Sequence, residues 1–186
     1  MKKTILTLIL ALFAFTAFSQ NNDGKSFRLP SGYQGFLEYG NSWAVFDKDM
    51  PNTINLSTTH GFYFNSHMYV GIGVGLAACR EFGLFPIYAN LRYVMSNRSA
   101  VSPVMSLRLG SYVSEGVGAY GDLAFGARIA SKRDFAVSIM VAATYYDKMT
   151  YRYWNDSQDE YGEYVSEQVE KTINPSSVSL RIGIEW

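Results

Sequence analysis

Charged side chains recur at alternate positions in segments that are otherwise apolar. Asp122 and Arg128 lie in AYGDLAFGARIA, and Arg181 and Glu185 lie in SVSLRIGIEW. An isolated charge is costly to bury, so the chemistry open to these side chains is pairing with opposite charges on a shared polar face. Seven residues are candidates for one charge network: Glu38, Arg92, Arg108, Asp122, Arg128, Arg181 and Glu185.

The sequence gives less support for catalytic residues than for a charge network. His60 follows the hydroxyl residues Ser57, Thr58 and Thr59, but a hydrolase also needs an acid that orients the base. No segment supplies an acid clearly on the face of His60, and that face is itself ambiguous. We therefore predict no catalytic residues, and an enzyme that modifies lipids is kept only as an alternative.

The glycines of GIGVG do not form a nucleotide-binding motif. Gly71, Gly73 and Gly75 are spaced by two, whereas a dinucleotide site needs G-x-G-x-x-G at a turn from strand to helix. We interpret them as small residues that leave room for larger neighbours. The sequence thus predicts no cofactor site, and no metal site either.

The first residues, MKKTILTLILALFAFTAFSQ, have the layout of a secretory signal peptide. Two lysines precede an apolar run and a small-residue cleavage site, and the run is short for a retained membrane helix, which needs about 20 residues. We expect cleavage after Ser19, a periplasmic lead-in over residues 20–31, and one domain over residues 32–186.

Composition excludes several classes of protein. Removing Lys2 and Lys3 leaves 14 basic side chains against 16 acidic ones, a net charge of −2, so nothing calls for nucleic acid. Cys79 is the only cysteine, so a disulfide framework cannot stabilise an exported fold. Charged residues make up 17% of the chain and aromatic residues 16%, which favours packing or a membrane as the source of stability.

Eight segments alternate with a period of two, which predicts strands. They begin at Gly32, Ile54, Met68, Pro86, Pro103, Ala119, Phe135 and Ser176. Each is about as long as a tilted membrane-spanning strand, which needs roughly 9–11 residues. One face of each segment is apolar, and the other mixes glycine, hydroxyl groups and charges.

These faces suit a barrel with its apolar face outward. A soluble barrel would bury the apolar face and would favour Lys, Glu and Thr outside, whereas glycine and paired charges suit a narrow lumen. The prediction is an all-β, eight-stranded, antiparallel, up-and-down transmembrane barrel. Aromatic residues near the segment ends would form two interfacial girdles: Tyr33, Phe64, Tyr93, Phe135 and Trp186 at one rim, and Tyr39, Trp43, Phe82, Tyr112 and Tyr145 at the other.

The lumen allows two interpretations. An eight-stranded barrel is just wide enough to be filled by side chains, so we expect the seven charges to form a paired plug. The alternative is a narrow pathway for small or apolar solutes, in which the arginines would favour anions.

The longest connection is the most distinctive segment. Residues 147–174 hold seven acidic and three basic side chains, and their alternation predicts a protruding hairpin. Short periplasmic turns and longer outer loops are the rule for such barrels, which places this hairpin outside the cell. Five aromatic residues are candidate contacts for an extracellular partner: Tyr151, Tyr153, Trp154, Tyr161 and Tyr164. The alternative is a solvent-exposed hairpin that binds no partner.

Several segments resemble known outer-membrane proteins. GYQGFLEYG, TTHGFYFNSHMYVGIGVGL, IYANLRY and the ending SVSLRIGIEW are similar to the small eight-stranded outer-membrane β-barrels of Gram-negative bacteria, in the porin-like superfamily. The resemblance implies that Leu180, Ile182, Ile184 and Trp186 form the signal read by the barrel-assembly machinery. It also implies a location in the outer membrane and contact with its lipid. Members of that superfamily differ in task, and we expect this chain to be a non-enzymatic monomer with a structural or surface-interaction role.

Overall fold

The structure, a computed structural model, describes residues 32–45, 51–79, 82–95, 100–114, 116–132, 135–147, 149–158, 164–173 and 176–186. The expected signal peptide (residues 1–19) and lead-in (residues 20–31) lie outside the described residues. Within the described ranges, no helix is long and apolar enough to cross a bilayer.

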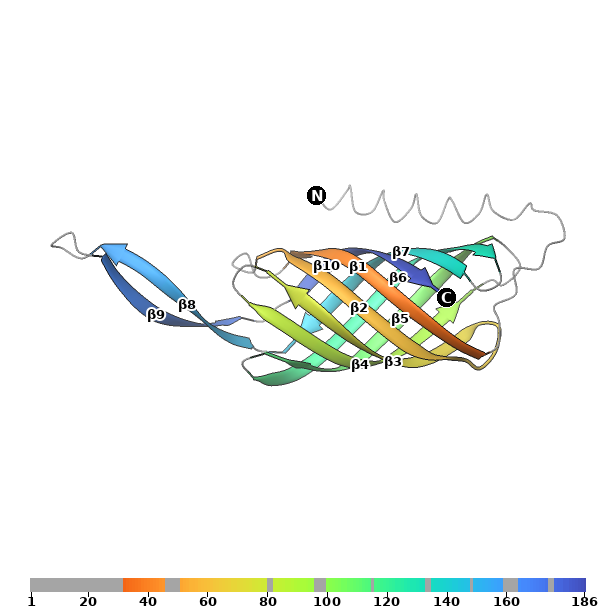
Figure 1. Cartoon of the computed structure of the whole chain (residues 1–186), viewed down its shortest axis with the longest axis horizontal. Helices are drawn as coiled ribbons and strands as arrows, with labels where there is room; N and C mark the ends of the chain where they lie inside the picture. The colour runs from red at the N-terminus through yellow and green to blue at the C-terminus, as the bar shows by residue number, and fades with distance from the viewer. Residues whose placement is uncertain are drawn as a thin grey trace.

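Eight strands form one closed antiparallel barrel (Figure 1). They are β1 (Gly32–Ala44), β2 (Thr53–Tyr63), β3 (Met68–Ala78), β4 (Gly83–Val94), β5 (Val101–Val113), β6 (Val117–Lys132), β7 (Phe135–Tyr146) and β10 (Ser176–Glu185). Each pairs with its neighbour along the chain, and β1 also pairs with β10, from Phe36 opposite Glu185 to Ala44 opposite Ser177. The predicted barrel and its eight strands are confirmed, although β2, β4, β5 and β6 begin one to three residues earlier than the alternation indicated.

The two remaining strands form the hairpin between β7 and β10. β8 (Met149–Gln158) pairs with β9 (Tyr164–Ile173) in a separate two-stranded sheet. Figure 1 shows this ribbon extending beyond one end of the barrel. We call that end the hairpin end. The opposite end holds the start of β1 and the end of β10.

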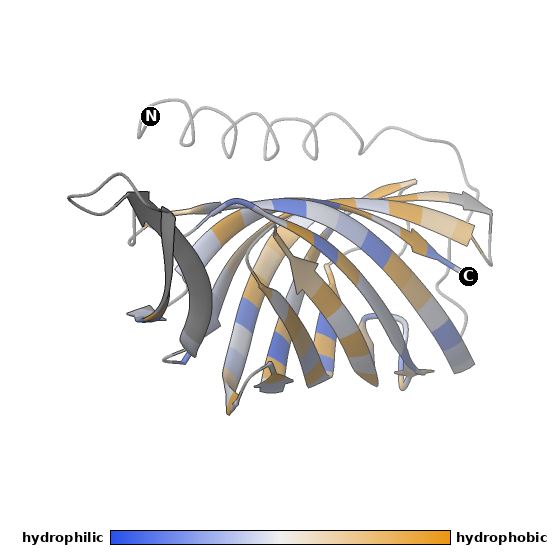
Figure 2. Ribbon diagram, turned by 60° about the vertical axis from the view of Figure 1, so that its left-hand side comes forward, coloured by the Kyte–Doolittle hydropathy of each residue, from blue (hydrophilic) through white to orange (hydrophobic). Residues whose placement is uncertain are grey.

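Apolar side chains cover the outside of the barrel. Alternate residues along the strands are exposed, as in β3, where Met68, Val70, Ile72 and Val74 point outward and Tyr69 is fully buried. Figure 2 shows the same alternation as bands of opposite hydropathy along the ribbons. The outward apolar face predicted from the sequence is therefore present.

The girdle assignment of Tyr112 was wrong. Its side chain is buried inside the barrel and packs with other tyrosines at the hairpin end. Tyr112 shares the phase of Arg108 along β5, and a strand places such residues on one face whatever their distance from its end. Phe82 is half-buried and packs against the same tyrosines. The other eight girdle residues are exposed.

A glycine shapes the junction between β1 and β10. The backbone N–H of Gly35 donates to the Trp186 carbonyl at 2.9 Å, and the Trp186 N–H donates to the Gly35 carbonyl at 3.1 Å. A Cβ on Gly35 would lie 2.8 Å from Cε2 of the Trp186 indole. The indole therefore lies against the bare backbone of Gly35, and a side chain there would displace it.

We predict that Gly35→Val impairs closure of the barrel, because overpacking a tight contact costs about 1–3 kcal/mol. The measurement is the folded fraction after refolding into detergent micelles, read as the band whose gel migration changes on boiling. Gly121→Val is the matched control, since a Cβ on this outward glycine of β6 meets only Leu109 Cδ2, at 3.8 Å. Equal folded fractions for the two variants would contradict the prediction.

Candidate functional site

The candidate site is the charged interior of the barrel. The strands place all seven predicted charged residues in the lumen, and each is at most 4% exposed. Five strands supply them: Glu38 from β1, Arg92 from β4, Arg108 from β5, Asp122 and Arg128 from β6, and Arg181 and Glu185 from β10. Their shared inward phase follows from the alternation of strand side chains.

Two arginines form paired hydrogen bonds with carboxylates across β7. Arg181 donates to Asp122 Oδ1 at 2.9 Å and to Asp122 Oδ2 at 2.5 Å. Arg128 donates to Glu185 Oε2 at 2.8 Å and to Oε1 at 3.0 Å. Such two-pronged bonds are strong and fix the geometry of both partners.

The inward residues of β7 make these two pairs possible. β6 and β10 are not neighbours but flank β7, which presents Ala136, Ser138, Ala142 and Thr144 to the lumen. These small side chains let the arginines reach over β7, and Thr144 donates to Asp122 Oδ2 at 2.8 Å. Sequence reasoning did not include Ser138 and Thr144. Their signal was small residues at every second position of FAVSIMVAATYY.

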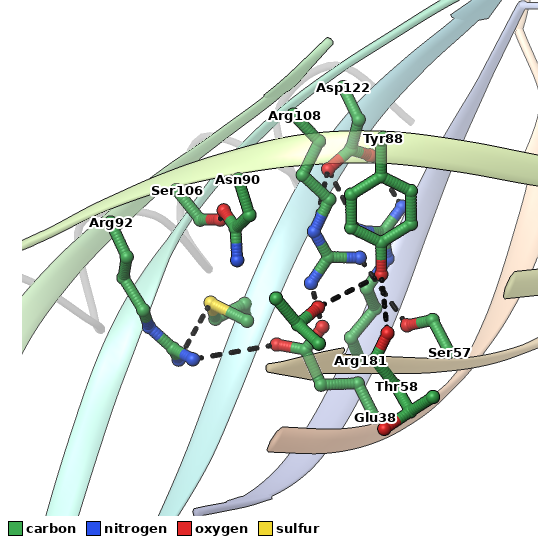
Figure 3. A network of polar contacts seen from close by, with 12 residues as sticks. Glu38, Ser57, Thr58, Tyr88, Asn90, Arg92, Ser106, Arg108, Asp122 and Arg181 are labelled. Carbon is green, nitrogen blue, oxygen red and sulfur yellow. Dashed lines mark hydrogen bonds and ion pairs between the residues drawn. The ribbon is translucent and has the colours of Figure 1, made fainter. Parts of the chain in front are cut away.

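The third carboxylate, Glu38, is shared by two arginines. It contacts Arg108 Nη2, and its Oε1 lies 3.7 Å from Arg92 Nη1. β1 and β5 are on opposite sides of the barrel, so the Glu38–Arg108 ion pair crosses the lumen. Figure 3 shows Arg92 and Arg108 approaching Glu38 from one wall. Arg92 also lies 4.4 Å above the Phe36 ring, where a cation–π contact is favourable.

Two clusters of apolar and tyrosine side chains share the lumen with the charges. At the hairpin end, four tyrosines pack with Ala77 and Leu84: Tyr88, Tyr112, Tyr120 and Tyr146. Toward the opposite end, Phe36 and Tyr69 pack with Tyr63, Val94, Val104, Ala124, Met140 and Ala142. The glycines of β3 provide space for the rings. A Cβ on Gly71 would lie 2.5 Å from the Tyr69 hydroxyl, and one on Gly73 would lie 2.6 Å from Tyr88 Cε2. This confirms the packing role predicted for these glycines.

His60 lies on the outer wall and not in the lumen. Its Nδ1 is 2.6 Å from the Tyr33 hydroxyl, and its Nε2 is 3.0 Å from Thr58 Oγ1. Ser57 Oγ accepts from Arg108 at 3.4 Å, and Thr59 Oγ1 is 3.0 Å from the Tyr88 hydroxyl inside the barrel. The strand therefore separates His60 from these two hydroxyls, and the three do not converge. No group of three His, Cys, Asp or Glu side chains in the described ranges could hold a metal ion.

The other candidate residues lie apart from the lumen charges. Leu180, Ile182, Ile184 and Trp186 are exposed on the outer wall along β10. In the hairpin, Tyr151 pairs with Lys171, Tyr153 with Val169, Trp154 with Gln168, and Tyr164 with Gln158. Tyr161 lies outside the described residues.

The same architecture occurs in a solved structure, that of Neisserial surface protein A (NspA). The two chains are 14% identical, the match covers 82% of this chain and 94% of that one, and the TM-score is 0.52. This chain has the fold of an eight-stranded outer-membrane β-barrel.

A second solved structure, the N-terminal β-barrel domain of Pseudomonas aeruginosa OprF, is 8% identical with a TM-score of 0.48. That match covers 84% of this chain and 100% of the domain. No protein-family model and no curated protein matches the chain. The fold is therefore assigned from the geometry of the barrel and from its likeness to the NspA structure.

We predict that Asp122→Leu and Arg181→Met each destabilise the barrel by about 3–5 kcal/mol, because each leaves a buried charge without its partner. The free energy of unfolding should fall less in the double variant than in either single variant, since the double variant buries two apolar side chains and leaves no unpaired charge. Urea unfolding in detergent micelles measures all three, and the non-additivity gives the coupling between the two residues. A double variant whose loss equals the sum of the single losses would refute the pairing.

Proposed function

We propose that this protein is a non-enzymatic, integral outer-membrane β-barrel of a Gram-negative envelope, with a structural or surface-interaction role and a plugged lumen. One observation carries the proposal. The barrel is apolar outside, whereas its interior holds seven buried charges and two clusters of apolar and tyrosine side chains. A bilayer is the solvent that suits such an outer wall.

The dimensions of the wall support a location in the membrane. The barrel strands are 10–16 residues long, enough for a tilted strand that crosses the hydrocarbon layer in about 9–11 residues. Closure leaves no unpaired sheet edge facing lipid. Tyr33, Phe135 and Trp186 are exposed near one end of the barrel, and Tyr39, Trp43 and Tyr145 near the other. Aromatic rings at both ends suit the two interfaces of a bilayer.

Connection lengths support an orientation with the hairpin outside the cell. At the end opposite the hairpin, β2 and β3 are joined by four residues, 64–67, and β6 and β7 by two. The hairpin end carries the longest connection, which includes β8 and β9. Short turns face the periplasm in such barrels. The exposed row Leu180, Ile182, Ile184 and Trp186 would engage the barrel-assembly machinery during insertion, and one chain closes the wall alone, as a monomer.

The filled lumen favours a plug over the channel alternative. The Glu38–Arg108 pair crosses the interior, and apolar side chains lie on both sides of it. A continuous aqueous path would need these side chains to move. The position of His60 on the outer wall, away from Ser57 and Thr59, likewise favours a non-enzymatic role over lipid modification.

The test of this proposal is fractionation followed by reconstitution. The protein should be recovered from the outer membrane and should give no discrete conductance steps in a planar bilayer. The conductance of the Arg92→Ala variant is measured under the same conditions, because this truncation removes a large side chain from the lumen. Steps from the wild-type protein that disappear in Arg92→Ala would establish an arginine-lined channel instead. Recovery from the periplasm as a soluble protein would refute the membrane location.

The β8–β9 hairpin is the part of the proposed protein best placed to meet a partner. It is a two-stranded sheet that projects beyond the barrel, and its segment is rich in tyrosine and acidic residues. Aromatic residues dominate the energetics of many interfaces. We therefore assign the surface-interaction role to residues 147–174.

We predict that deleting residues 155–163 leaves the barrel folded, because the barrel strands make their hydrogen bonds without β8 and β9. The same deletion should abolish binding to host cells or to extracellular matrix. Binding of labelled cells to the deletion variant is compared with their binding to Trp154→Ala and to the wild type. Heat-modifiable gel migration checks that each protein is folded. Unchanged binding by a folded deletion variant would remove the hairpin from the functional surface.

A further inference from the structure

The buried charges of the lumen do not balance. The described strands bury four arginines and three carboxylates. Arg128 with Glu185 and Arg181 with Asp122 form complete pairs, which leaves Arg92 and Arg108 sharing Glu38. An uncompensated charge in a low-dielectric interior is costly. We propose that the lumen binds one monovalent anion of about halide size beside Arg108.

Hydrogen bonding around Glu38 shows the same imbalance. Arg108 Nε makes no hydrogen bond and lies 3.9 Å from Asp122 Oδ1, while Arg108 Nη1 donates to Ser57 Oγ only at 3.4 Å. Arg92 Nε and Asn90 Nδ2 are also buried without an acceptor among the described residues. A buried donor that is left without an acceptor loses its hydrogen bond to water and gains nothing in return. Both Glu38 carboxylate oxygens also lack a hydrogen bond and meet the two arginines only as ion pairs, so the Arg108 Nε donor stays unsatisfied, and an anion supplies it with both a charge and an acceptor.

A cavity borders Arg108 on the side toward the hairpin end. Glu38, Arg181, Tyr88, Tyr120 and Tyr146 line it together with Arg108. The remaining lining residues on β1, β2 and β3 include the small residues Gly40, Ser57, Gly75 and Ala77. Neighbours pack closely against two of these glycines, since a Cβ on Gly75 would lie 3.1 Å from the Pro86 ring and one on Gly40 would lie 2.7 Å from Arg181 Cγ.

The size and charge of this cavity select the ligand. Its volume is about 320 Å³ with the open mouth included, and the enclosed part is no larger than one or two water molecules. A halide fits such a space, whereas sulfate or phosphate does not. Two guanidinium groups and one carboxylate line the cavity, and the Asp122 carboxylate that pairs with Arg181 is not among the lining residues. Figure 3 shows the Arg108 guanidinium beside Tyr88, with Ser57 close to the tyrosine hydroxyl.

The anion is a structural ligand and is not transported. The apolar cluster around Phe36 and Tyr69 lies in the lumen on the other side of the Glu38–Arg108 pair. The site is thus independent of whether the hairpin binds a partner. Conductance steps would overturn the plug and leave the bromide experiment below to decide the anion site separately.

The direct test uses bromide as the probe. Crystals of the wild-type barrel grown in sodium bromide are measured at the bromine absorption edge. We expect one anomalous peak inside the lumen within hydrogen-bond distance of the Arg108 guanidinium. Bromide peaks only at the outer surface, or water without anomalous signal beside Arg108, would overturn the proposal.

Variants of opposite charge provide a second test in solution. The unfolding midpoint in micelles is compared in sodium chloride and in sodium gluconate at equal ionic strength, so that screening is matched. Chloride should raise the wild-type midpoint by about 3 °C, the shift expected for roughly 1 kcal/mol in a chain of this size. Arg92→Gln balances the charges and should abolish the shift, whereas Glu38→Gln increases the surplus and should enlarge it.

Val104→Ala is the matched control, because it creates a cavity in the apolar cluster without changing the lumen charge. It should lower the midpoint in both salts and keep the wild-type chloride shift. Equal shifts in all four proteins, or a sulfate effect as large as the chloride effect, would show general salt stabilisation and would overturn the site.

Discussion

The constraint on which this structure depends is the burial of charge in a lumen too narrow to hydrate it. Eight strands enclose a space that side chains fill, and the chain places four arginines and three carboxylates there. Each charge needs a partner at close range, since the cost of burying it alone exceeds what packing recovers. The small residues of β7 and the shared position of Glu38 follow from that requirement. Without small side chains on β7 the arginines could not reach their carboxylates on the far side of that strand.

The charges also connect strands that hydrogen bonding does not. Backbone ladders join each strand only to its two neighbours. Arg181 and Asp122 join β10 to β6 over β7, and Glu38 with Arg108 joins β1 to β5 across the barrel. Backbone hydrogen bonds thereby connect the strands around the circumference of the barrel, and ion pairs connect them through the lumen. A plugged barrel of this kind suits a rigid support for the β8–β9 hairpin, whose two strands have no barrel neighbour of their own.

Sequence periodicity was sufficient for the fold because a strand has a period of two, and every barrel strand carries it. The phase also identified the seven lumen charges, since Arg108 and Asp122 are in phase with glycine and serine. Two features were not predicted correctly from the alternation: the position of Tyr112 and the pairing of the charges. Tyr112 was misassigned because its position near a strand end was given more weight than its phase. The pairing of Arg128 with Glu185, 57 residues apart, depends on the stagger of β6, β7 and β10, which one sequence does not specify.

The incomplete pairing of Arg92 and Arg108 has a physical explanation in the shape of the wall. β1, β2 and β3 present small inward residues next to Glu38, whereas β4 to β6 present arginines and tyrosines. Glu38 must therefore reach across open space toward two arginines on the crowded side, and it contacts one of them more closely than the other. A second carboxylate on β2 or β3 would fill the cavity and balance the charge. With Ser57 and Gly75 at those positions, no described strand supplies that carboxylate, and the proposed anion takes its place.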